Sequence, residues 1–361
     1  MDVHSEAAPE NTPEKSRQDN AIATLLETCE VDWQKKLVSR IIETGIGLGL
    51  DGTSRLNLKI SAAALEEMRA AFRLFAPFSA APKVTIFGSA RTTADDPLSG
   101  QALRVSGELA AQGWMVVTGA GPGIMEAAST GAGPEHSLGV SIRLPFEEQP
   151  THEIAGNDRL VSMKYFFTRK LMLVKESRGF VCLPGGYGTM DETFELLTLQ
   201  QTGKMVPVPI VLLDRPGGTF WRGFERFVLE HLEGDSMISA GDLDRVLITE
   251  SVDEAVAEIT GFWRNYDSLR WVGEQLVLRL RAAPTSAEVQ TLNEQFAGLL
   301  HSGRIEQTDP LPAEAADNDE LELARLVFTP RRRAVGELHR LIRAVNELSS
   351  APASCALPPA S

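Results

Sequence analysis

A glycine-rich stretch near the middle of the chain has the residue types of an anion-binding loop. It reads Leu183-Pro184-Gly185-Gly186-Tyr187-Gly188-Thr189-Met190-Asp191-Glu192 and lies between an apolar run typical of a strand and a segment typical of a helix. Glycines let backbone N–H groups approach a ligand closely, and a helix N-terminus favours negative charge. Thr189 can cap the helix and can also donate its hydroxyl group to a phosphate. The stretch predicts a phosphate site at Gly185, Gly186, Gly188 and Thr189, with an ordinary glycine-rich turn as the alternative.

Two further loops occupy the same kind of position, at the end of a predicted strand. Thr118-Gly119-Ala120-Gly121-Pro122-Gly123-Ile124 lacks the dinucleotide-binding fingerprint, because that motif needs a glycine where Ile124 stands. Phe87-Gly88-Ser89-Ala90-Arg91 ends the first apolar run of the same region. Both loops could be tight turns that serve packing alone. As ligand-binding loops they would contribute Gly119, Gly121, Gly123 and Ser89.

A basic pair precedes the glycine-rich stretch in a segment with helical character. The run Tyr165-Phe166-Phe167-Thr168-Arg169-Lys170 places Arg169 and Lys170 directly after two aromatic residues. Basic residues on a helix usually face solvent. The phenylalanine pair predicts a partly buried turn, which favours an arginine that is paired or bound to a ligand.

Several other classes of chemistry lack their motifs. Neither a GxSxG elbow nor a GxxxxGK[ST] loop is present, and the histidines show no metal-binding spacing. The three cysteines, Cys29, Cys182 and Cys355, are too far apart to predict a disulfide framework or a zinc site. We therefore expect no metal site, serine hydrolase or P-loop nucleotidase.

Composition and charge narrow the class further. Acidic side chains outnumber basic ones by 49 to 35, a net charge of −14, which argues against nucleic-acid binding. No apolar run reaches the ~18 residues of a membrane span, and the first twenty residues lack the apolar stretch of a signal peptide. These features predict a cytoplasmic protein without nucleic-acid or membrane partners.

The elements that would position these loops follow a strand–helix alternation. Short apolar runs predict strands near 84–87, 115–118, 138–142, 159–162, 180–183, 209–213 and 246–249. Helical patterns lie between them at about 99–112, 123–132, 164–177, 189–203, 219–233 and 252–265. Alternation of this kind predicts an α/β fold with a doubly wound, Rossmann-like parallel sheet of about seven strands. Ligands bind such sheets beyond the carboxyl ends of the strands, where all three glycine loops fall.

The flanks have a different texture and give the expected domain boundaries. Residues 1–20 and 349–361 are predicted disordered by composition. Residues 21–82 are predicted to be a helical N-terminal extension in which the stretch Gly45–Gly52 ends the first helix. Residues 83–265 form the predicted nucleotide-binding catalytic core. Residues 266–348 are predicted to be a helical C-terminal extension, because Leu269, Val272, Leu276 and Leu280 recur at helical spacing.

Taken together, the motifs resemble a known family. The glycine-rich stretch reads PGGxGTxxE, Arg169-Lys170 lies upstream with Arg169 23 residues before Glu192, and GSA at 88–90 and GAGPGIMEA at 119–127 accompany them. This set resembles the Lonely Guy family, formerly called lysine decarboxylases, over roughly residues 84–260. The long flanks are similar to those of the longer bacterial members. Plant-type members have Met-His-x-Arg-Lys where this chain has Phe166-Phe167-Thr168-Arg169-Lys170, so the base preference stays open.

The resemblance implies hydrolysis of the N-glycosidic bond of a purine nucleoside 5′-monophosphate, such as AMP or a cytokinin riboside monophosphate. It places the catalytic pair on Arg169 and Glu192, the phosphate loop on Gly185 to Thr189, and Lys170 beside the nucleotide. It also implies a homodimer or higher homo-oligomer. No metal or organic cofactor is expected.

Elementary chemistry agrees with these roles. Cleavage of the C1′–N9 bond develops oxocarbenium character on the ribose, which a carboxylate can stabilise. Glu192 could instead hold the ribose hydroxyls or take a proton from water. Arg169 stays charged and is suited to electrostatic stabilisation. The Thr-x-x-Glu spacing also fits a capping box between Thr189 and Glu192, which is the structural alternative.

Two other functions are compatible with parts of the pattern. A non-catalytic nucleotide carrier or sensor would keep the phosphate loop without turnover, although the Arg169–Glu192 pair favours a hydrolase. A decarboxylase would need a Schiff-base lysine and pyridoxal phosphate. None of Lys164, Lys170, Lys175 and Lys204 stands in a context that demands one.

Overall fold

A computed structural model describes residues 13–143, 158–331 and 335–354 of the chain. The chain divides into two compact units, Met1–Glu66 and Glu67–Ser361. The second unit contains every residue of the predicted site.

The first unit is helical. It contains α1 (Pro13–Thr28), α2 (Lys35–Leu50) and the first half of α3 (Arg55–Phe75). The predicted disorder of residues 1–20 is wrong from Pro13 onward, where α1 begins, and residues 1–12 lie outside the described residues. The helix end predicted in the stretch Gly45–Gly52 is found at Leu50, although α2 continues through Gly45, Gly47 and Gly49. A glycine weakens a helix by only about 1 kcal/mol, and the chain turns where Gly52 adopts a φ of 64°.

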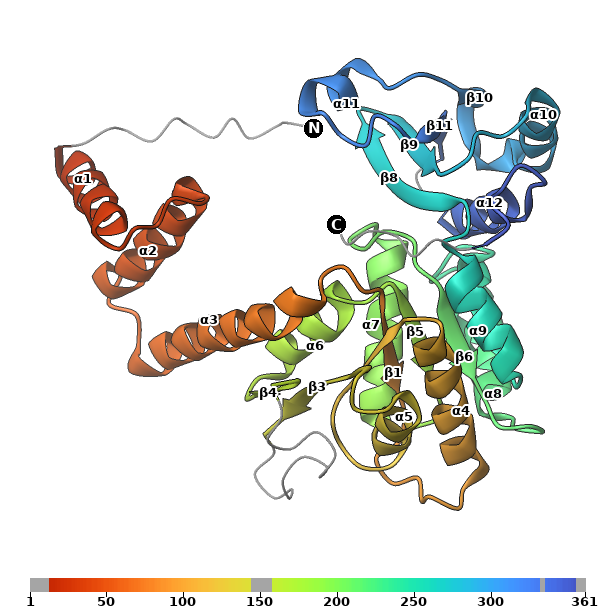
Figure 1. Ribbon diagram of the computed structural model, residues 1–361, viewed down its shortest axis with the longest axis horizontal. Helices are drawn as coiled ribbons and strands as arrows, with labels where there is room; N and C mark the ends of the chain where they lie inside the picture. Colours follow the sequence, from red (N-terminus) through yellow and green to blue (C-terminus); the bar gives the residue numbers. More distant parts are fainter. Residues whose placement is uncertain (1–12, 144–157, 332–334, 355–361) are drawn as a thin grey trace. The chain divides into compact units, whose positions relative to one another are not determined.

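The second unit is built on a seven-stranded parallel sheet (Figure 1). Its strands are β1 (Lys83–Phe87), β2 (Met115–Thr118), β3 (Ser137–Ile142), β4 (Leu160–Met163), β5 (Gly179–Cys182), β6 (Ile210–Leu213) and β7 (Val246–Thr249). Their order is β4-β3-β2-β1-β5-β6-β7, and every pairing is parallel. β1, β2, β5 and β6 are buried along their whole length, as expected when helices cover both faces. The predicted doubly wound α/β fold is confirmed.

Helices cover both faces of this sheet. α4 (Pro97–Ala111), α5 (Ile124–Ala132) and α9 (Val252–Gly261) share one face, where α4 contacts the other two. α6 (Phe166–Lys175), α7 (Tyr187–Gln201) and α8 (Phe220–Phe227) lie together on the other. α8 continues as a π-helical segment, Val228–Glu233. The strand order reverses between β1 and β5, so the loops after these two strands diverge and leave room for a ligand.

The C-terminal part of the chain differs from the prediction. The helical extension predicted for 266–348 is wrong, because the structure has a four-stranded antiparallel sheet of order β10-β11-β9-β8. Its strands are β8 (Tyr266–Val272), β9 (Gln275–Leu280), β10 (Leu300–Gln307) and β11 (Ala324–Pro330). Gly273, with a φ of 62°, opens the two-residue turn that folds β8 back onto β9. The apolar spacing of three and four residues therefore spans a hairpin.

Three helices accompany this sheet: α10 (Ser286–Gln295), α11 (Pro312–Asp317) and α12 (Val335–Glu347). These three helices are the parts of residues 266–348 that agree with the predicted helical extension. The residues after it are ordered, since Ala351 is buried and the Pro352 carbonyl accepts a hydrogen bond from Arg264 Nε at 2.6 Å. The predicted disorder of 349–361 is therefore wrong for residues 349–354, and 355–361 lie outside the described residues.

A buried carboxylate ties the C-terminal sheet together. Glu314 is fully buried and accepts hydrogen bonds from Arg279 Nη2 at 2.7 Å and Arg325 Nε at 3.2 Å. Asp319 gives Arg279 a second partner at 2.6 Å. The two guanidinium groups are themselves almost inaccessible to solvent, so their charge depends on these carboxylates.

Replacing Glu314 with alanine is expected to lower the free energy of unfolding by about 3–5 kcal/mol, because two buried arginines lose their shared counter-charge. Denaturant unfolding followed by circular dichroism measures the change. The exposed Glu322→Ala is the matched control and should change stability by less than about 0.5 kcal/mol. Equal effects of the two substitutions would contradict a structural role for the buried cluster.

Candidate active site

A cavity of about 1420 Å³ opens at the carboxyl ends of the parallel strands. Five strand ends contribute to it, through 87–91 after β1, 119–122 after β2, 141–143 at the end of β3, Ser162 in β4 and 185–190 after β5. The three glycine loops singled out in the sequence therefore meet at one place, beside the reversal of the strand order. This is where a doubly wound sheet binds its ligands.

The anion-binding character of the loop after β5 comes from the start of α7. The helix begins at Tyr187, and its N-cap residue, Gly186, has no side chain to occupy the first amide groups. Gly185, Gly186, Gly188 and Thr189 all line the cavity. A β-carbon at Gly185 would overlap the Thr189 side chain and come within 3.0 Å of the Ser89 amide nitrogen, so this close packing requires glycine. The backbone amides of this turn can thus approach an anion in the cavity.

Thr189 differs from its predicted position in the helix. It is the third helical residue rather than the cap, and it is almost fully buried. Its carbonyl accepts a hydrogen bond from the Thr193 hydroxyl at 2.8 Å. Since the cap is Gly186, the capping box considered for Thr189 and Glu192 does not apply, and Glu192 has a different environment.

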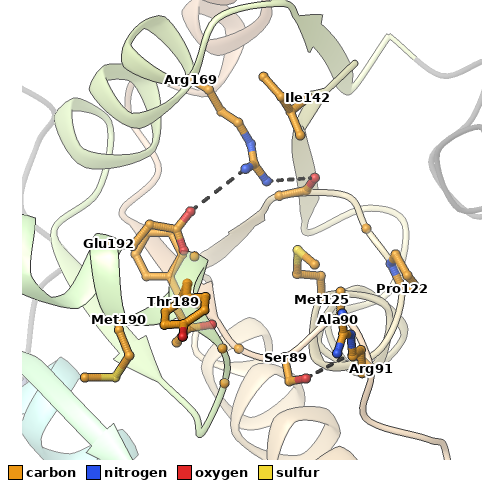
Figure 2. A pocket seen from close by; sticks show the side chains of 18 of the residues that line it. Ser89, Ala90, Arg91, Pro122, Met125, Ile142, Arg169, Thr189, Met190 and Glu192 are labelled. Carbon is orange, nitrogen blue, oxygen red and sulfur yellow. Dashed lines mark hydrogen bonds and ion pairs between the residues drawn. The ribbon is translucent and has the colours of Figure 1, made fainter. Parts of the chain in front are cut away.

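Glu192 faces Arg169 across the cavity wall. Figure 2 shows the two side chains reaching toward each other from α7 and α6, with Arg169 Nη1 at 3.9 Å from Glu192 Oε1. Only 15% of the Glu192 side chain and 11% of the Arg169 side chain are exposed. Burial raises the pKa of Glu192 from its ordinary 4.5 to about 7, while the charges of Arg169 and Lys170 oppose the rise. A carboxylate with a pKa near neutrality is suited to proton transfer or to stabilising a positive charge.

Backbone carbonyls fix the position of Arg169. Its Nε donates to the Val140 carbonyl at 2.9 Å, and its Nη2 donates to the Gly119 carbonyl at 3.3 Å. A β-carbon at Gly119 would overlap the guanidinium group, so this glycine permits the arginine to reach its place. The guanidinium is therefore held between the ends of β2 and β3, with one edge toward Glu192.

Two of the predicted site residues lie elsewhere. Lys170 does not line the cavity. Its Nζ pairs with Asp191 at 2.7 Å and with Glu195 at 2.9 Å, two residues of α7 that do not line the cavity either. Gly123 does not line the cavity either. It has a φ of 70°, and a β-carbon there would overlap the Ser89 carbonyl, so it packs one loop against another. Gly119, Gly121 and Ser89 line the cavity as predicted.

The cavity also contains residues that the sequence reasoning missed. Arg91 and Arg143 add positive charge at its margin. Phe220, Phe224 and Phe227 of α8 form an aromatic wall, and their spacing along one helix face resembles an ordinary core stripe. The sequence feature that could have indicated Arg91 as a cavity residue is its position directly after the Gly88-Ser89-Ala90 turn. Arg143 directly follows a predicted strand, which gave a weaker signal.

Within 13–143, 158–331 and 335–354, no three or more His, Cys, Asp or Glu side chains gather where they could hold a metal ion. None of the helices in those ranges combines the length and apolar character needed to cross a bilayer.

Comparisons with known proteins indicate the family that this chain resembles. Residues 123–259 match the family model described as "Possible lysine decarboxylase". The cytokinin riboside 5′-monophosphate phosphoribohydrolase of Mycobacterium marinum is 29% identical over 42% of this chain and 80% of its own length. The protein of the same name from Mycobacterium tuberculosis is 27% identical over 43% of this chain and 81% of its own length. The resemblance to the Lonely Guy family is confirmed. The enzyme of this family from Oryza sativa subsp. japonica is 31% identical over 41% of this chain and 60% of its own length.

The molybdenum cofactor binding protein of Rippkaea orientalis superposes with a TM-score of 0.36 at 21% identity, covering 49% of this chain and 93% of that protein. A likeness at this level carries no functional argument. The homo-oligomer and the cytoplasmic location expected from the sequence stay predictions.

The burial of Glu192 has a consequence for stability. Because its pKa is higher in the folded chain than its ordinary value of 4.5, the stability of the folded state falls as the pH rises from about 4.5 to about 7, and the full loss persists above pH 7. Glu192→Gln is therefore expected to stabilise the protein by roughly 1–3 kcal/mol at pH 8 relative to the wild type. Thermal unfolding at pH 5 and pH 8 tests this. A variant that is less stable than the wild type at both pH values would contradict it.

Proposed function

We propose that this protein hydrolyses the N-glycosidic bond of a purine nucleoside 5′-monophosphate. The products are the free base and ribose 5-phosphate, and the substrate is AMP or an N6-substituted AMP such as a cytokinin riboside monophosphate. The observation that carries the proposal is the pair of Arg169 and Glu192, largely buried beside an anion-binding helix N-terminus in one cavity. The names of the mycobacterial and rice relatives support the same reaction.

The geometry suggests how the substrate would lie. The 5′-phosphate accepts hydrogen bonds from the backbone amides at the start of α7, between Gly185 and Thr189. Arg91, at the end of the β1 loop, contributes positive charge on the same side of the cavity. The ribose then extends along α7 toward Glu192, which is one turn further into the helix than Thr189. The base enters the remaining space between Phe166, the loop after β2 and the end of β3.

Bond cleavage transfers the C1′–N9 electron pair to the base, and positive charge develops on C1′ and the ring oxygen. An ionised Glu192 stabilises this charge and can accept a proton from the attacking water, whose oxygen bonds to C1′. The base nitrogen takes up a proton from solvent as it leaves, and the proton that Glu192 accepts from the attacking water returns to solvent, so the reaction consumes one water in all. Arg169 keeps Glu192 ionised near neutral pH and remains charged throughout, so it acts electrostatically rather than as a proton donor.

The family description "Possible lysine decarboxylase" implies different chemistry that the site does not fit. Pyridoxal phosphate needs a lysine amine within the cavity to form its Schiff base. Among the described residues that line the cavity there is no lysine, and Lys170 is paired with two carboxylates outside it. The residues present therefore support hydrolysis of a glycosidic bond and give no place for that cofactor.

Incubation of the protein with AMP should release adenine and ribose 5-phosphate, detected by chromatography. Arg169→Ala and Glu192→Ala should each lower kcat/KM by about 10²–10³-fold, because each removes one charge from the reacting centre. Glu274→Ala, an exposed carboxylate in the turn between β8 and β9, is the control and should retain wild-type activity. Tight binding of AMP and other nucleoside monophosphates without release of base would overturn the proposal and favour the carrier.

The pKa of Glu192 gives the reaction a characteristic pH dependence. If the ionised carboxylate is the active form, kcat/KM should rise tenfold per pH unit and level off above about pH 7. The phosphate of the substrate titrates near pH 6, so Glu192→Gln should keep only that lower inflection. A rate that instead falls above pH 7 in the wild type would show that the protonated form of Glu192 is required.

A further inference from the structure

A glutamate outside the cavity holds the start of the helix that carries Arg169. Glu67 lies in α3, more than 90 residues before α6 in the sequence, and only 6% of it is exposed. Its Oε1 accepts a hydrogen bond from the Lys164 amide at 2.8 Å, and its Oε2 accepts one from the Thr168 hydroxyl at 2.6 Å. A longer bond of 3.4 Å runs from the Tyr165 amide to Oε2. A single carboxylate thus receives three donors from one turn of the chain.

These bonds surround a helix start whose N-cap residue makes no capping bond, and they reach the amides of Lys164 and Tyr165 directly before the first helical turn. The N-cap of α6 is Tyr165, which has extended backbone angles and makes no side-chain capping bond. The amide groups around a helix start need acceptors, and a negative charge there is favourable for the helix dipole. Glu67 provides both from a distant part of the chain. Because it is an acceptor at both oxygens, it suits a site where every neighbour is a donor.

The held turn leads directly to the catalytic arginine. Arg169 follows Thr168, and its amide donates to the Tyr165 carbonyl at 3.2 Å. The guanidinium of Arg169 then has to meet the carbonyls of Val140 and Gly119 and one edge of Glu192 at the same time. A shift of the helix start by a fraction of an ångström would break this set of distances, and misplacement of about 1 Å can cost 10²-fold in rate.

Glu67 also pairs with a residue that lines the cavity. The Arg143 guanidinium, which lines the cavity, lies 3.9 Å from Glu67 Oε1, although 64% of the Arg143 side chain is exposed. One buried carboxylate therefore connects α3 with both basic residues at this end of the site, Arg143 through an ion pair and Arg169 through its helix.

We infer that Glu67 is a positioning residue for the glycosidase reaction, which sets the place of Arg169 by fixing the first turn of α6. The inference rests on the proposed function. It predicts that loss of Glu67 lowers kcat and leaves the KM for AMP nearly unchanged, because the phosphate-binding turn of α7 does not contact Glu67.

Substitutions of graded severity test the inference. Glu67→Ala should lower kcat by roughly 10–100-fold. Thr168→Val removes one donor and should cause a smaller loss of the same parameter, which covers the case in which Glu67→Ala does not fold. Glu67→Gln keeps one acceptor oxygen and should restore part of the activity. The neighbouring exposed Glu66→Gln is the matched control and should behave as the wild type.

The pH profile separates positioning from a loss of structure. The charged groups around Glu192 are Arg169 and Lys170 on α6 and Asp191 and Glu195 on α7, and Arg169 gives the largest opposition to its raised pKa. If Arg169 moves away, the acid limb of kcat/KM should shift to higher pH in Glu67→Ala and Thr168→Val. A purely structural role would lower the active fraction and the unfolding temperature without moving the limb, and that result would overturn the inference.

Amide hydrogen exchange keeps this test distinct from that of the proposed function. Peptides that cover α6 should exchange faster in Glu67→Ala than in the wild type, while peptides that cover α7 should not change. If the wild type released no base from AMP, the proposed function would fail, and unchanged exchange of α6 would separately refute the role of Glu67. If the wild type were active and Glu67→Ala kept its kcat and acid limb, only the positioning role would fall.

Discussion

The charge state of the site depends on the burial of the Glu192 carboxylate. Burial weakens the ionised form, so the pKa of Glu192 rises toward 7, and the nearby Arg169 charge limits that rise. A carboxylate in this state interacts strongly with a positive charge that develops nearby, because little solvent screens it. The protein holds the Arg169 charge near this carboxylate, because the guanidinium donates hydrogen bonds to the Val140 carbonyl in β3 and to the Gly119 carbonyl directly after β2.

The topology explains why several distant segments are needed. The reversal of strand order between β1 and β5 opens the space at the carboxyl ends of the strands, and the N-terminus of α7 faces this space. Arg169, however, comes from α6, which follows the edge strand β4 and packs on β3 and β4. Arg169 and Glu192 therefore come from the edge and the centre of the sheet. Their distance depends on the placement of α6, and Glu67 of α3 accepts hydrogen bonds from the chain at the start of that helix.

Local patterns predicted most of the core and the loops of the site. All seven parallel strands and the meeting of the three glycine loops followed from apolar runs and turn residues. Sequence patterns gave wrong predictions in two situations. In one, the position of a side chain is set by partners far away in the sequence; in the other, the same spacing of apolar residues fits both a helix and a hairpin. The apolar residues from Leu269 to Leu280 have helical spacing, but the turn at Gly273 divides them between two strands. Lys170 is adjacent to Arg169 in the sequence, but its amine pairs with Asp191 and Glu195 outside the cavity. The role of Glu67 had no local signal, because its partners lie about a hundred residues away.

Three buried glutamates show what distinguishes a reactive carboxylate from a structural one. Glu314 and Glu67 receive hydrogen bonds at 2.6–3.2 Å from arginine or from the chain around a helix start. Burial alone would raise the pKa of Glu314, but bonds from Arg279 and the Leu311 amide hold that pKa below its ordinary value. Glu192 has its arginine at 3.9 Å, beyond hydrogen-bond distance, and its pKa is raised. An incompletely compensated carboxylate in a cavity gains most from a positively charged transition state, and among these three glutamates this favours Glu192 for the proposed reaction.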